Sequence, residues 1–424
     1  MRILFIGNNF PPEVNALATR LYEHARTWTS EGREVVVLTD VPNFPEGIVY
    51  EGYQNTYSEE KMDGIEVVRV PLYITQNEGT IKRILSFISF MLSSIWYSRR
   101  IKGSFDVVVA SSPQFFAAIG GYVISKMKGA RFVLEIRDLW PESIVAVGAM
   151  SRNLIIRFFE QIEHFLYRKA DHIVVVTNTF KRVIAGKSID PKKISVLKNG
   201  ADLTRYEQPL NEQTLTQLRK THDLEGKFVA SYIGTIGMAH RVDVLLDAAE
   251  KCTRDDVVFV IVGTGANRKA LEERLAERPL ANVRLIDKQP KSLVLYWLAL
   301  SNASIVHLKA SPLFKTVIPS KIFEAMAMRI PILLGVDGET REIIEEAEAG
   351  LFFTPEDSDA LLESVLKLRD DAALSTQLGL NGQAYVRHYH DREKIARRYW
   401  KLLEGLNGGV VSEDVEAREA IDAY

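Results

Sequence analysis

Short apolar runs alternate with amphipathic stretches along the chain, and this alternation occurs in two series. The first series contains RILFIG, EVVVLT, IEVVRV, FDVVVA, RFVLEI and DHIVVV, and the second contains FVASYIG, VVFVIVG, NVRLID, ASIVHL and IPILLG. Runs of this length that are rich in β-branched residues and separated by helical patterns are typical of parallel strands joined by crossover helices. The sequence therefore predicts an α/β protein with two doubly wound domains.

A polar stretch separates the two series. Between residues 199 and 227 the apolar periodicity weakens, as expected for a connection between domains, and two domains suit a chain of 424 residues. We predict a first domain over 1–205, a second over 206–390, a C-terminal helix over 391–406 and an acidic tail over 407–424. The C-terminal helix is a candidate to pack back on the first domain.

The charge of the chain argues against nucleic acid as a partner. The formal net charge is −2, although residues 1–200 carry +5 and residues 201–424 carry −7. The only cysteine, Cys252, excludes an internal disulfide framework and a cysteine-based metal cage. The apolar run at the N-terminus is too short for a signal peptide, so we expect a cytoplasmic protein.

Metal binding is not expected either. No HExxH or comparable pair of histidine ligands occurs. The triplet DSD at 357–359 resembles a metal-binding motif, but it opens the helical pattern SDALLESVLKL, where Asp and Ser favour a helix start. We therefore expect helix capping there, and neither a metal nor a cofactor.

The stretch PSKIFEAMAMRIPIL, residues 319–333, places one carboxylate, Glu324, in the first turn of a helix. In open α/β sheets, ligands bind beyond the carboxyl ends of the strands, where helix N-termini present free N–H groups. A carboxylate there repels a diphosphate, but it can accept two hydrogen bonds from a ribose diol. The alternative is that Glu324 only complements the helix macrodipole.

Six blocks carry a resemblance to a known family. They are NNFPPEVNALATRLYEHARTWTSEGREVVVLTD, RDLWPES, LKNGADLTRY, YIGTIGMAHRVDVLLDAA, VIVGTGANRKAL and FEAMAMRIPIL. As an ordered series they resemble the retaining family 4 glycosyltransferases of GT-B fold, especially bacterial transferases of acetamido sugars such as N-acetylfucosamine in O-antigen and capsule assembly. The resemblance implies two Rossmann-like domains facing a central cleft, a UDP-sugar donor and a lipid-linked acceptor at the inner face of the cytoplasmic membrane.

The resemblance implies that the second domain binds most of the donor. Glu324 would hold the ribose hydroxyls. Gly263 and Gly265 follow a strand and would let the backbone approach the nucleotide closely, although they could simply form a tight turn. Lys288 belongs to the segment that corresponds to the family's base-binding region.

The diphosphate side departs from the family pattern. Relatives usually supply an Arg and a Lys here, whereas this chain has Thr235 and His240. The charge would come instead from Arg241 or Lys321, with backbone amides near Gly237, since preorganised donors stabilise a developing anion. His240 can hydrogen-bond a phosphate when it is protonated. The alternative for Arg241 and Lys321 is solvated helix surface.

The acceptor side, in the first domain, offers carboxylates. Many relatives carry a His before Asp138, but this chain has Arg137, which cannot act as a base. Asp138 is a candidate to orient sugar hydroxyls, with helix capping as the alternative, and Glu142 and Glu13 are further candidates. No acid–nucleophile pair typical of a glycosidase occurs. The resemblance implies a front-face displacement that depends on positioning and electrostatics, with Asp138, Arg241 and Lys321 as the catalytic candidates.

The loop LFKTVIPSK bears on the donor sugar. Relatives usually carry a second Glu eight residues before the ribose carboxylate, whereas this chain has Thr316, and Pro319 stands where the family favours Gly. Thr316 and Ser320 are expected to line the donor site. One hydroxyl in place of a carboxylate predicts a donor whose hydroxyl pattern differs from that of glucose, such as an acetamido or deoxy sugar. The alternative is that a neighbouring group replaces the carboxylate and Thr316 only packs.

An apolar segment, IKRILSFISFMLSSIWYSRRIK, has basic residues at both ends. Its uncharged part, residues 84–98, would form a helix roughly 22 Å long, which is short of the ~30 Å hydrocarbon thickness of a bilayer. Ser86, Ser89 and Ser93 share a narrow face, and residues such as Phe87, Met91 and Trp96 cover the rest. The pattern suits a helix lying on anionic lipid, and the alternative is a helix packed wholly inside the first domain.

These observations favour a retaining, metal-independent glycosyltransferase of surface polysaccharide biosynthesis. Two other functions remain open: a non-catalytic scaffold that binds nucleotide sugars, which the altered phosphate positions allow, and a GT-B epimerase or phosphorylase.

Overall fold

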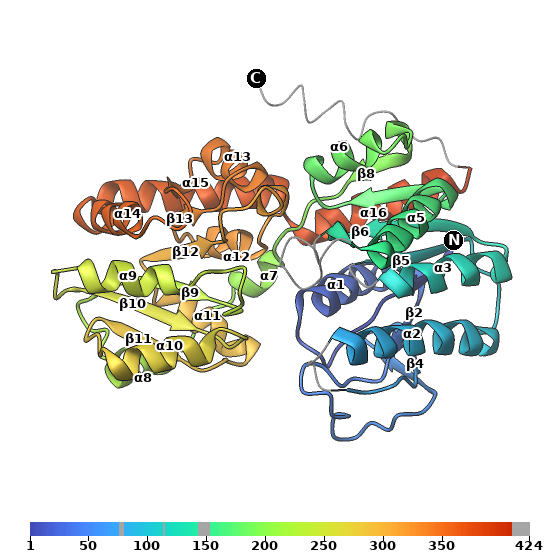
Figure 1. Cartoon of the computed structure of the whole chain (residues 1–424), viewed down its shortest axis with the longest axis horizontal. Coiled ribbons are helices and arrows are strands. Elements are labelled where there is room, and N and C mark those ends of the chain that lie inside the picture. The colour runs from blue at the N-terminus through green and yellow to red at the C-terminus, as the bar shows by residue number, and fades with distance from the viewer. Residues whose placement is uncertain (76–79, 113–114, 143–152, 409–424) are drawn as a thin grey trace. The chain divides into compact units, whose positions relative to one another are not determined.

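The computed structural model describes residues 1–75, 80–112, 115–142 and 153–408. The chain divides into two compact units, and the first contains residues 1–198 together with the C-terminal segment from Arg392. The second unit is Asn199–Asp391 (Figure 1). It begins seven residues before the expected boundary because the Ala201 N–H donates to the carbonyl of His390, with an N–O distance of 2.9 Å, and Ala201 pairs with Asp391 in a parallel bridge.

The first unit contains an eight-stranded sheet in the order β3-β4-β2-β1-β5-β6-β7-β8. All neighbouring strands are parallel except β3 and β4. The strands are β1 Arg2–Ile6, β2 Glu34–Asp40, β3 Ser58–Met62, β4 Ile65–Val70, β5 Val107–Ser111, β6 Arg131–Ile136, β7 His172–Val175 and β8 Ile194–Val196. The apolar runs of the first series form the central strands, because a parallel sheet is buried on both faces.

Helices cover this sheet (Figure 1). They are α1 Ala16–Ser30, α2 Thr80–Tyr97, α3 Phe115–Lys128, α5 Leu154–Lys169, α6 Asn178–Gly186 and α16 Arg392–Leu406, with short 3-10 turns η1 Ser98–Arg100 and η2 Pro191–Lys193. α2 packs beside α3, and α3 beside α5.

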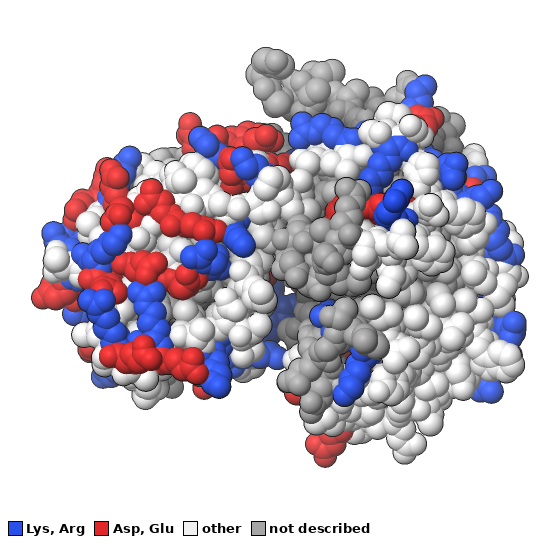
Figure 2. All heavy atoms as spheres, viewed as in Figure 1, with Lys and Arg blue, Asp and Glu red and all other residues white. Residues whose placement is uncertain are grey.

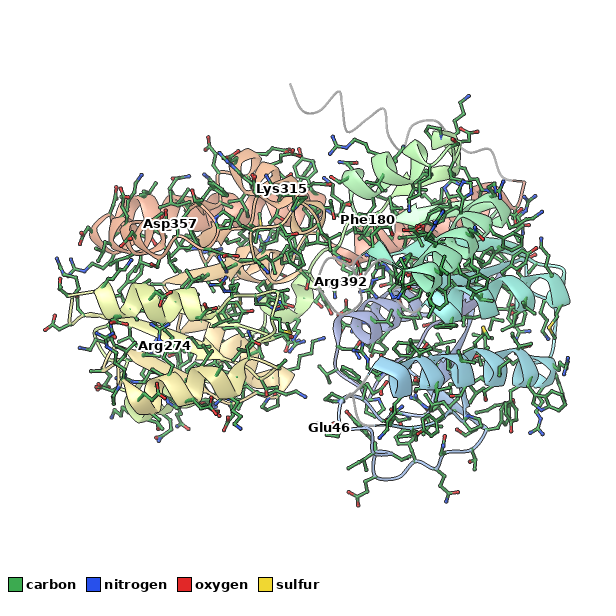
Figure 3. All side chains as sticks on the ribbon, in the orientation of Figure 1. Glu46, Phe180, Arg274, Lys315, Asp357 and Arg392 are labelled. Atoms are coloured by element: carbon green, nitrogen blue, oxygen red, sulfur yellow. The ribbon has the colours of Figure 1, made fainter. Side chains whose placement is uncertain are left out.

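The C-terminal helix α16 packs on α1 within the first unit. Trp28 of α1 donates from its indole nitrogen to the carbonyl of Ala396 at 2.7 Å, and the ring centroids of Trp28 lie 5.5 Å from those of both Tyr399 and Trp400. Arg392, at the start of α16 (Figure 3), forms an ion pair with Glu23. The buried aromatic side chains explain why the last helix belongs to the first unit, since a helix of this kind is stable only with its apolar face covered.

The second unit contains a six-stranded parallel sheet in the order β11-β10-β9-β12-β13-β14. Its strands are β9 Phe228–Ile233, β10 Val257–Val262, β11 Val283–Ile286, β12 Ala303–His307, β13 Ile332–Gly335 and β14 Gly350–Phe352. The strand order changes direction between β9 and β12, and such switch points are where ligands bind in open α/β sheets.

The second unit also contains ten short or medium helices among its residues, all of which are described. They are α7 Leu203–Tyr206, α8 Glu212–Thr221, α9 Asp243–Lys251, α10 Arg268–Glu277, α11 Lys291–Ala299, η3 Phe314–Thr316, α12 Lys321–Ala327, α13 Glu339–Glu346, α14 Ser358–Asp370 and α15 Ala372–Tyr389. Asp357 (Figure 3) caps α14 by accepting from the N–H groups of Asp359 and Ala360 at 3.1 and 3.0 Å. The predicted capping role of this acidic triplet is confirmed.

Candidate functional site

Two loops meet at the carboxyl ends of β9 and β10. The N–H of Ile236 donates to the carbonyl of Thr264 at 2.8 Å, and the N–H of Asn267 donates to that of Ile236 at 2.9 Å. Gly263 and Gly265 have φ angles of 150° and 153°, and a Cβ on them would lie 1.9 Å from the Gly234 oxygen and 2.5 Å from the Ile236 oxygen. Both glycines are therefore required by the contact between the loops, which brings the backbone of the β9 loop to the edge of the sheet.

Lys321, the first residue of α12, points its amine at this edge. A Cβ on Gly234 would lie 3.0 Å from the Lys321 Nζ, and that Nζ lies 3.9 Å from the centre of the Tyr232 ring. The residue as a whole is half-buried, but its Nζ is enclosed and has no hydrogen-bond partner among the described residues. Burial lowers the pKa of Lys321 from 10.5 to about 7, and Glu324 partly opposes the shift.

His240 lies beside this amine in the β9 loop. Its Nδ1 is enclosed and finds no hydrogen-bond partner within the described part of the chain. Burial and the charge of Lys321 lower the pKa of His240 to about 4, so the imidazole is neutral near pH 7. A neutral imidazole can donate one hydrogen bond to a phosphate oxygen, but it adds no charge.

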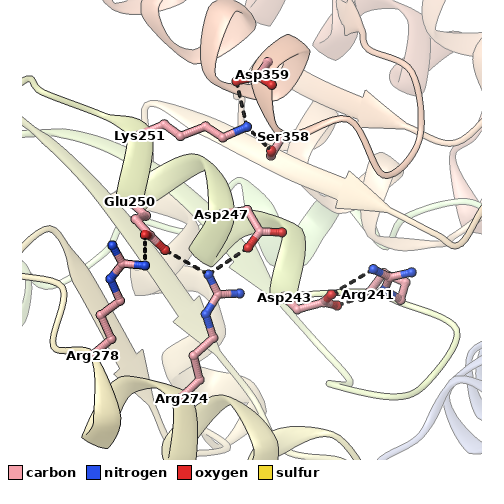
Figure 4. A network of polar contacts seen from close by, with 9 residues as sticks. All are labelled: Arg241, Asp243, Asp247, Glu250, Lys251, Arg274, Arg278, Ser358 and Asp359. Carbon is pink, nitrogen blue, oxygen red and sulfur yellow. Dashed lines mark hydrogen bonds and ion pairs between the residues drawn. The ribbon is translucent and has the colours of Figure 1, made fainter.

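Arg241 is bound by acidic side chains of the same unit. Its guanidinium pairs with Asp243 at 2.9 Å, as Figure 4 shows, and with Glu356 at 2.8 Å. His307 supports the same loop, because its Nδ1 lies 2.9 Å from the His240 carbonyl and its Nε2 accepts from the Glu356 N–H at 2.8 Å. These contacts of Arg241 hold the β9 loop in place. No local sequence pattern indicated Glu356 or His307 as supports of Arg241.

Glu324 lies one turn after Lys321 on α12. Burial raises the pKa of the Glu324 carboxyl, whereas Lys291, Arg205, Lys321 and a hydrogen bond from the Tyr206 hydroxyl lower it. Tyr206 belongs to the short helix α7, which lies in the part of the chain that the sequence indicated as a polar connection. No local pattern links it to Glu324, so sequence reasoning missed it.

The remaining predicted donor residues surround this edge. Thr316 ends the turn η3 and donates from its Oγ1 to the Leu313 carbonyl at 2.6 Å. Ser320 precedes α12 without a side-chain cap bond. Lys288 follows β11 in an exposed segment. There, Arg268, which was not predicted, pairs with Asp287 at 2.8 Å and donates to the Gly263 carbonyl at 2.6 Å.

In the first unit, Asp138 follows β6. It lines a small cavity with Phe115, Trp140, Glu163 and Tyr167. Burial and the charge of Glu142 raise the pKa of Glu163 to about 7, although the Tyr167 hydroxyl donates to it at 2.5 Å and Lys187 Nζ lies 2.7 Å from its carboxylate.

The two other acidic candidates of the first unit, Glu142 and Glu13, already accept hydrogen bonds from neighbouring residues. Glu142 accepts from Lys187 at 2.5 Å. Glu13 is buried, and it accepts from the N–H groups of Asn43 and Phe44 at 2.9 and 2.7 Å. Burial and the nearby Asp40 raise the pKa of Glu13 to about 7. Glu13 therefore ties together the loops after β1 and β2.

The apolar segment forms α2, and its exposed side differs from the expected one. Leu85, Leu92 and Trp96 are 50%, 58% and 63% exposed, whereas Phe87 is half-buried. Met91 packs on α3, where a Cβ on Gly120 would lie 3.4 Å from its Cγ. Among the described residues, no helix is long and apolar enough to cross a membrane.

Exposed apolar side chains also occur on the two neighbouring helices. Of the thirteen large exposed apolar side chains in the described residues, eight belong to α2, α3 and α5. They are Leu85, Leu92, Trp96, Met127, Leu154, Ile155, Phe158 and Phe165. We call this surface the apolar face. Figure 2 shows a broad uncharged area over the first unit with Lys and Arg at its margin.

Comparison with known proteins gives a consistent picture. A model of the glycosyl transferase 4-like domain matches residues 15–200, and a model of glycosyl transferases group 1 matches residues 215–385. WcaI of Escherichia coli (strain K12), a protein assigned to colanic acid biosynthesis as a glycosyl transferase, is 24% identical over 96% of this chain and 100% of its own. An Escherichia coli UDP-Gal:α-D-GlcNAc-diphosphoundecaprenol α-1,3-galactosyltransferase is 24% identical over 74% of this chain and 77% of its own.

Solved structures share the fold. Anabaena HepE in complex with UDP-glucose superposes with a TM-score of 0.70 at 15% identity, covering 96% of this chain and 100% of HepE. WaaG, a glycosyltransferase involved in lipopolysaccharide biosynthesis, superposes with a TM-score of 0.65 at 16% identity, covering 95% and 100%. The two Rossmann-like α/β units therefore have the GT-B fold.

Proposed function

Since the chain belongs to the glycosyltransferases of GT-B fold, with a glycosyl transferase 4-like domain followed by a group 1 domain, we propose that it transfers a sugar from a UDP-sugar to a lipid-linked acceptor with retention of anomeric configuration. The proposed sugar is an acetamido or deoxy sugar. The proposed setting is surface polysaccharide biosynthesis at the inner face of the cytoplasmic membrane.

One observation carries the donor assignment: an enclosed amine and a carboxylate lie one turn apart on α12, at the carboxyl edge of the second sheet. The Lys321 Nζ has no hydrogen-bond partner among the described residues, and burying an unpaired ammonium is costly. A diphosphate beside Gly234 would supply the missing partner. Glu324, held by Tyr206, would then accept hydrogen bonds from the ribose diol.

The same residues would stabilise the leaving group. As the bond from the anomeric carbon to the diphosphate breaks, negative charge develops on the phosphate oxygens. Lys321, the neutral imidazole of His240 and backbone amides near Gly237 are donors fixed in a partly dry site, where they are more effective than in water. Arg241 would act indirectly, since its pairs with Asp243 and Glu356 hold the loop.

In a front-face displacement the departing phosphate oxygen takes the proton of the attacking hydroxyl, so no separate general base is needed. Asp138, in the first unit, would orient acceptor hydroxyls. Lys321 would supply the positive charge that a divalent cation supplies in other transferases. We therefore propose turnover without a metal.

Thr316 supports the choice of sugar. Its hydroxyl proton already goes to the Leu313 carbonyl, so Thr316 offers a ligand only acceptor lone pairs of a neutral oxygen. Fewer strong acceptors suit a donor with fewer free hydroxyls. An N-acetylated or deoxy sugar has this property.

The acceptor proposal has two supports. One relative is named for a diphosphoundecaprenol acceptor. The apolar face of the first unit, with Lys82, Arg83, Arg99 and Arg100 at the ends of α2, combines the properties that hold a protein on anionic lipid.

The test is a donor panel with and without acceptor membranes, in the presence and absence of a chelator. We expect transfer from a UDP-acetamido sugar, dependent on membranes and insensitive to chelation, and NMR should show the donor's anomeric configuration in the product. Binding of UDP-sugars without turnover would identify a scaffold instead, and conversion of the donor without an acceptor would indicate an epimerase.

A further inference from the structure

Five aromatic side chains gather where α3 and α5 begin. We call Phe115, Phe116, Trp140, Phe158 and Phe159 the aromatic cluster. The ring centroids of Phe115 and Trp140 are 4.4 Å apart, those of Trp140 and Phe159 are 5.0 Å apart, and those of Phe158 and Phe159 are 6.0 Å apart. The first turns of helices that follow parallel strands lie at the carboxyl edge of the sheet. The cluster therefore lies at the functional edge of the first unit.

The inner side of the cluster borders the acceptor-side carboxylate. Phe115 and Trp140 line a cavity of about 10 Å³ together with Asp138. This volume is about that of one water probe, so the inner side is closed to a sugar or a lipid.

On the outer side of the cluster, described side chains at the start of α5 are exposed. Leu154, Ile155 and Phe158, in the first two turns of α5, are 80%, 54% and 57% exposed. Three large apolar side chains exposed so close together are unusual at a surface with no ligand. Arg157 lies among them and is also exposed.

We propose that the outer side of the aromatic cluster binds the hydrocarbon chain of the acceptor at the point where the chain joins its diphosphate. The proposal rests on the proposed function, because it requires an acceptor linked to a lipid. Leu154, Ile155 and Phe158 contact the first isoprenoid-sized units of the chain, and Arg157 pairs with the diphosphate. The sugar attached to the diphosphate then lies at the carboxyl edge of the first sheet, next to Asp138 after β6.

Charge and continuity favour a lipid over a protein at this surface. The segments 80–97 and 115–128, which form α2 and α3, contain no Asp or Glu, and Lys82, Arg83, Lys126 and Lys128 are their charged residues. The outer side of the cluster is the α5 part of the apolar face, and α3, which packs beside both α2 and α5, links it to the rest of that face. On α5, Glu163 is buried and Glu160 is half-buried, so Arg157 is the exposed charged residue beside Leu154 and Phe158. An apolar surface bordered mainly by basic residues matches a hydrocarbon chain ending in phosphate.

The experiment compares farnesyl diphosphate with methyl diphosphate by calorimetry on the full-length chain, because the two probes share the diphosphate and differ in the hydrocarbon. The test variant is Leu154→Ser with Phe158→Ser. Two controls are Leu92→Ser with Trp96→Ser on α2, and Leu380→Ser, an exposed leucine on α15 of the second unit. All these side chains are exposed, so the substitutions should leave the melting temperature unchanged.

Wild type should prefer farnesyl diphosphate, and the α5 variant should lose about tenfold or more of that preference, while both control proteins keep it. A wild type without preference, or an α5 variant that retains it, would overturn the proposal. An α2 variant that loses the farnesyl preference to the same extent would also overturn the proposal. Such a result would mean that the hydrocarbon adsorbs on the whole apolar face and not at one site. A dimeric wild type would also contradict the proposal if the α5 substitutions made it monomeric but left its preference for farnesyl diphosphate unchanged. The exposed side chains would then form a dimer interface.

UDP binding separates this proposal from the proposed function. If UDP binds normally but the farnesyl preference is absent, only the chain-binding site is wrong. If UDP does not bind, the transferase assignment itself fails.

Discussion

Lys321 holds its amine in an enclosed position, with Glu324 as the nearby counter-charge. Its depressed pKa means that, near neutral pH, the unliganded protein is divided between the charged and the neutral amine. A bound diphosphate favours the charged form. Proton uptake and ligand binding are therefore linked at this one nitrogen.

UDP affinity should fall as pH rises from 7 to 9. Above about pH 7 the free amine is mostly neutral, so binding must add a proton, and the affinity should decrease by up to about tenfold per pH unit until the pKa of the complex is reached. Calorimetry in two buffers of different ionisation enthalpy measures the affinity and the proton uptake together. Lys321→Arg, which stays charged, should flatten the profile, and a flat wild-type profile would contradict the assignment.

Glu324→Ala should impair use of the donor. Each charge-assisted hydrogen bond to the ribose contributes about 1.5–3 kcal/mol, so kcat/KM should fall by about ten- to more than a hundredfold. Tyr206→Phe, which leaves the carboxylate but removes the hydroxyl that orients it, should cost less and mainly raise the donor KM. Unchanged turnover in a folded Glu324→Ala protein would remove the ribose assignment.

Thr316→Glu should shift donor selectivity towards UDP-glucose. The longer carboxylate adds two strong acceptors for sugar hydroxyls and removes room for other substituents. Competition among UDP-glucose, UDP-N-acetylglucosamine and UDP-6-deoxy acetamido sugars measures the ratio of kcat/KM values. A wild type that prefers UDP-glucose would overturn the donor proposal, and an unchanged ratio in the variant would free Thr316 of this role.

At the scale of single elements, the sequence predicted strands better than surfaces. The run VVFVIVG forms β10 because a fully buried strand leaves an uninterrupted apolar pattern. RFVLEI forms β6 with a single buried charge, Glu135, which pairs with Arg20. β3, SEEKM, was not predicted, since a polar edge strand has no such pattern. The order of the motifs indicated the GT-B fold. The contact of Tyr206 with Glu324 and the pairs of Arg241 depend on tertiary packing, which periodicity does not encode.

α2 shows the same limit. Ser86, Ser89 and Ser93 suggested one polar face, but Ser86 is buried, Ser89 and Ser93 are half-buried, and Met91 packs on α3. The orientation of the helix follows from its neighbour, because Gly120 of α3 lets the two helices approach closely. Leu85, Leu92 and Trp96 remain outside.

Replacing Leu85, Leu92 and Trp96 together by Ser should release the protein from anionic liposomes. The three side chains are exposed, so the folded state should keep its stability within about 0.5 kcal/mol per site, whereas each loses roughly 1.5–3 kcal/mol of burial in the lipid interface. Liposome flotation at low and high salt measures binding. Met91→Ser is the matched contrast, and it should lower the melting temperature; a triple variant that still floats would exclude α2 as the lipid contact.

At the scale of the whole molecule, each unit has its own core. Trp400 of α16 is buried with Trp28 in the first unit, and Trp297 of α11 is buried in the second. The chain enters the second unit after Lys198 and returns to the first at Arg392.

Trp400→Ala should destabilise the first unit selectively. Truncating a buried Trp costs about 3–5 kcal/mol, so differential scanning calorimetry should show a lower transition for the first unit while UDP binding to the folded second unit persists. Trp297→Ala should show the converse. A Trp400→Ala protein that loses UDP affinity at a temperature where both units are folded would show that the cores are not independent.

The bridge between Ala201 and Asp391 brings together the entry and the exit of the second unit. That unit is thus inserted in the sequence of the first one with its two ends side by side, and domains with adjacent ends tolerate excision and transplantation well. Residues 199–391 could be exchanged as one cassette for the corresponding segment of a relative. Such a chimera would keep the acceptor specificity of one protein and take the donor specificity of the other. Exchange of this segment would thus place a different sugar on the same acceptor.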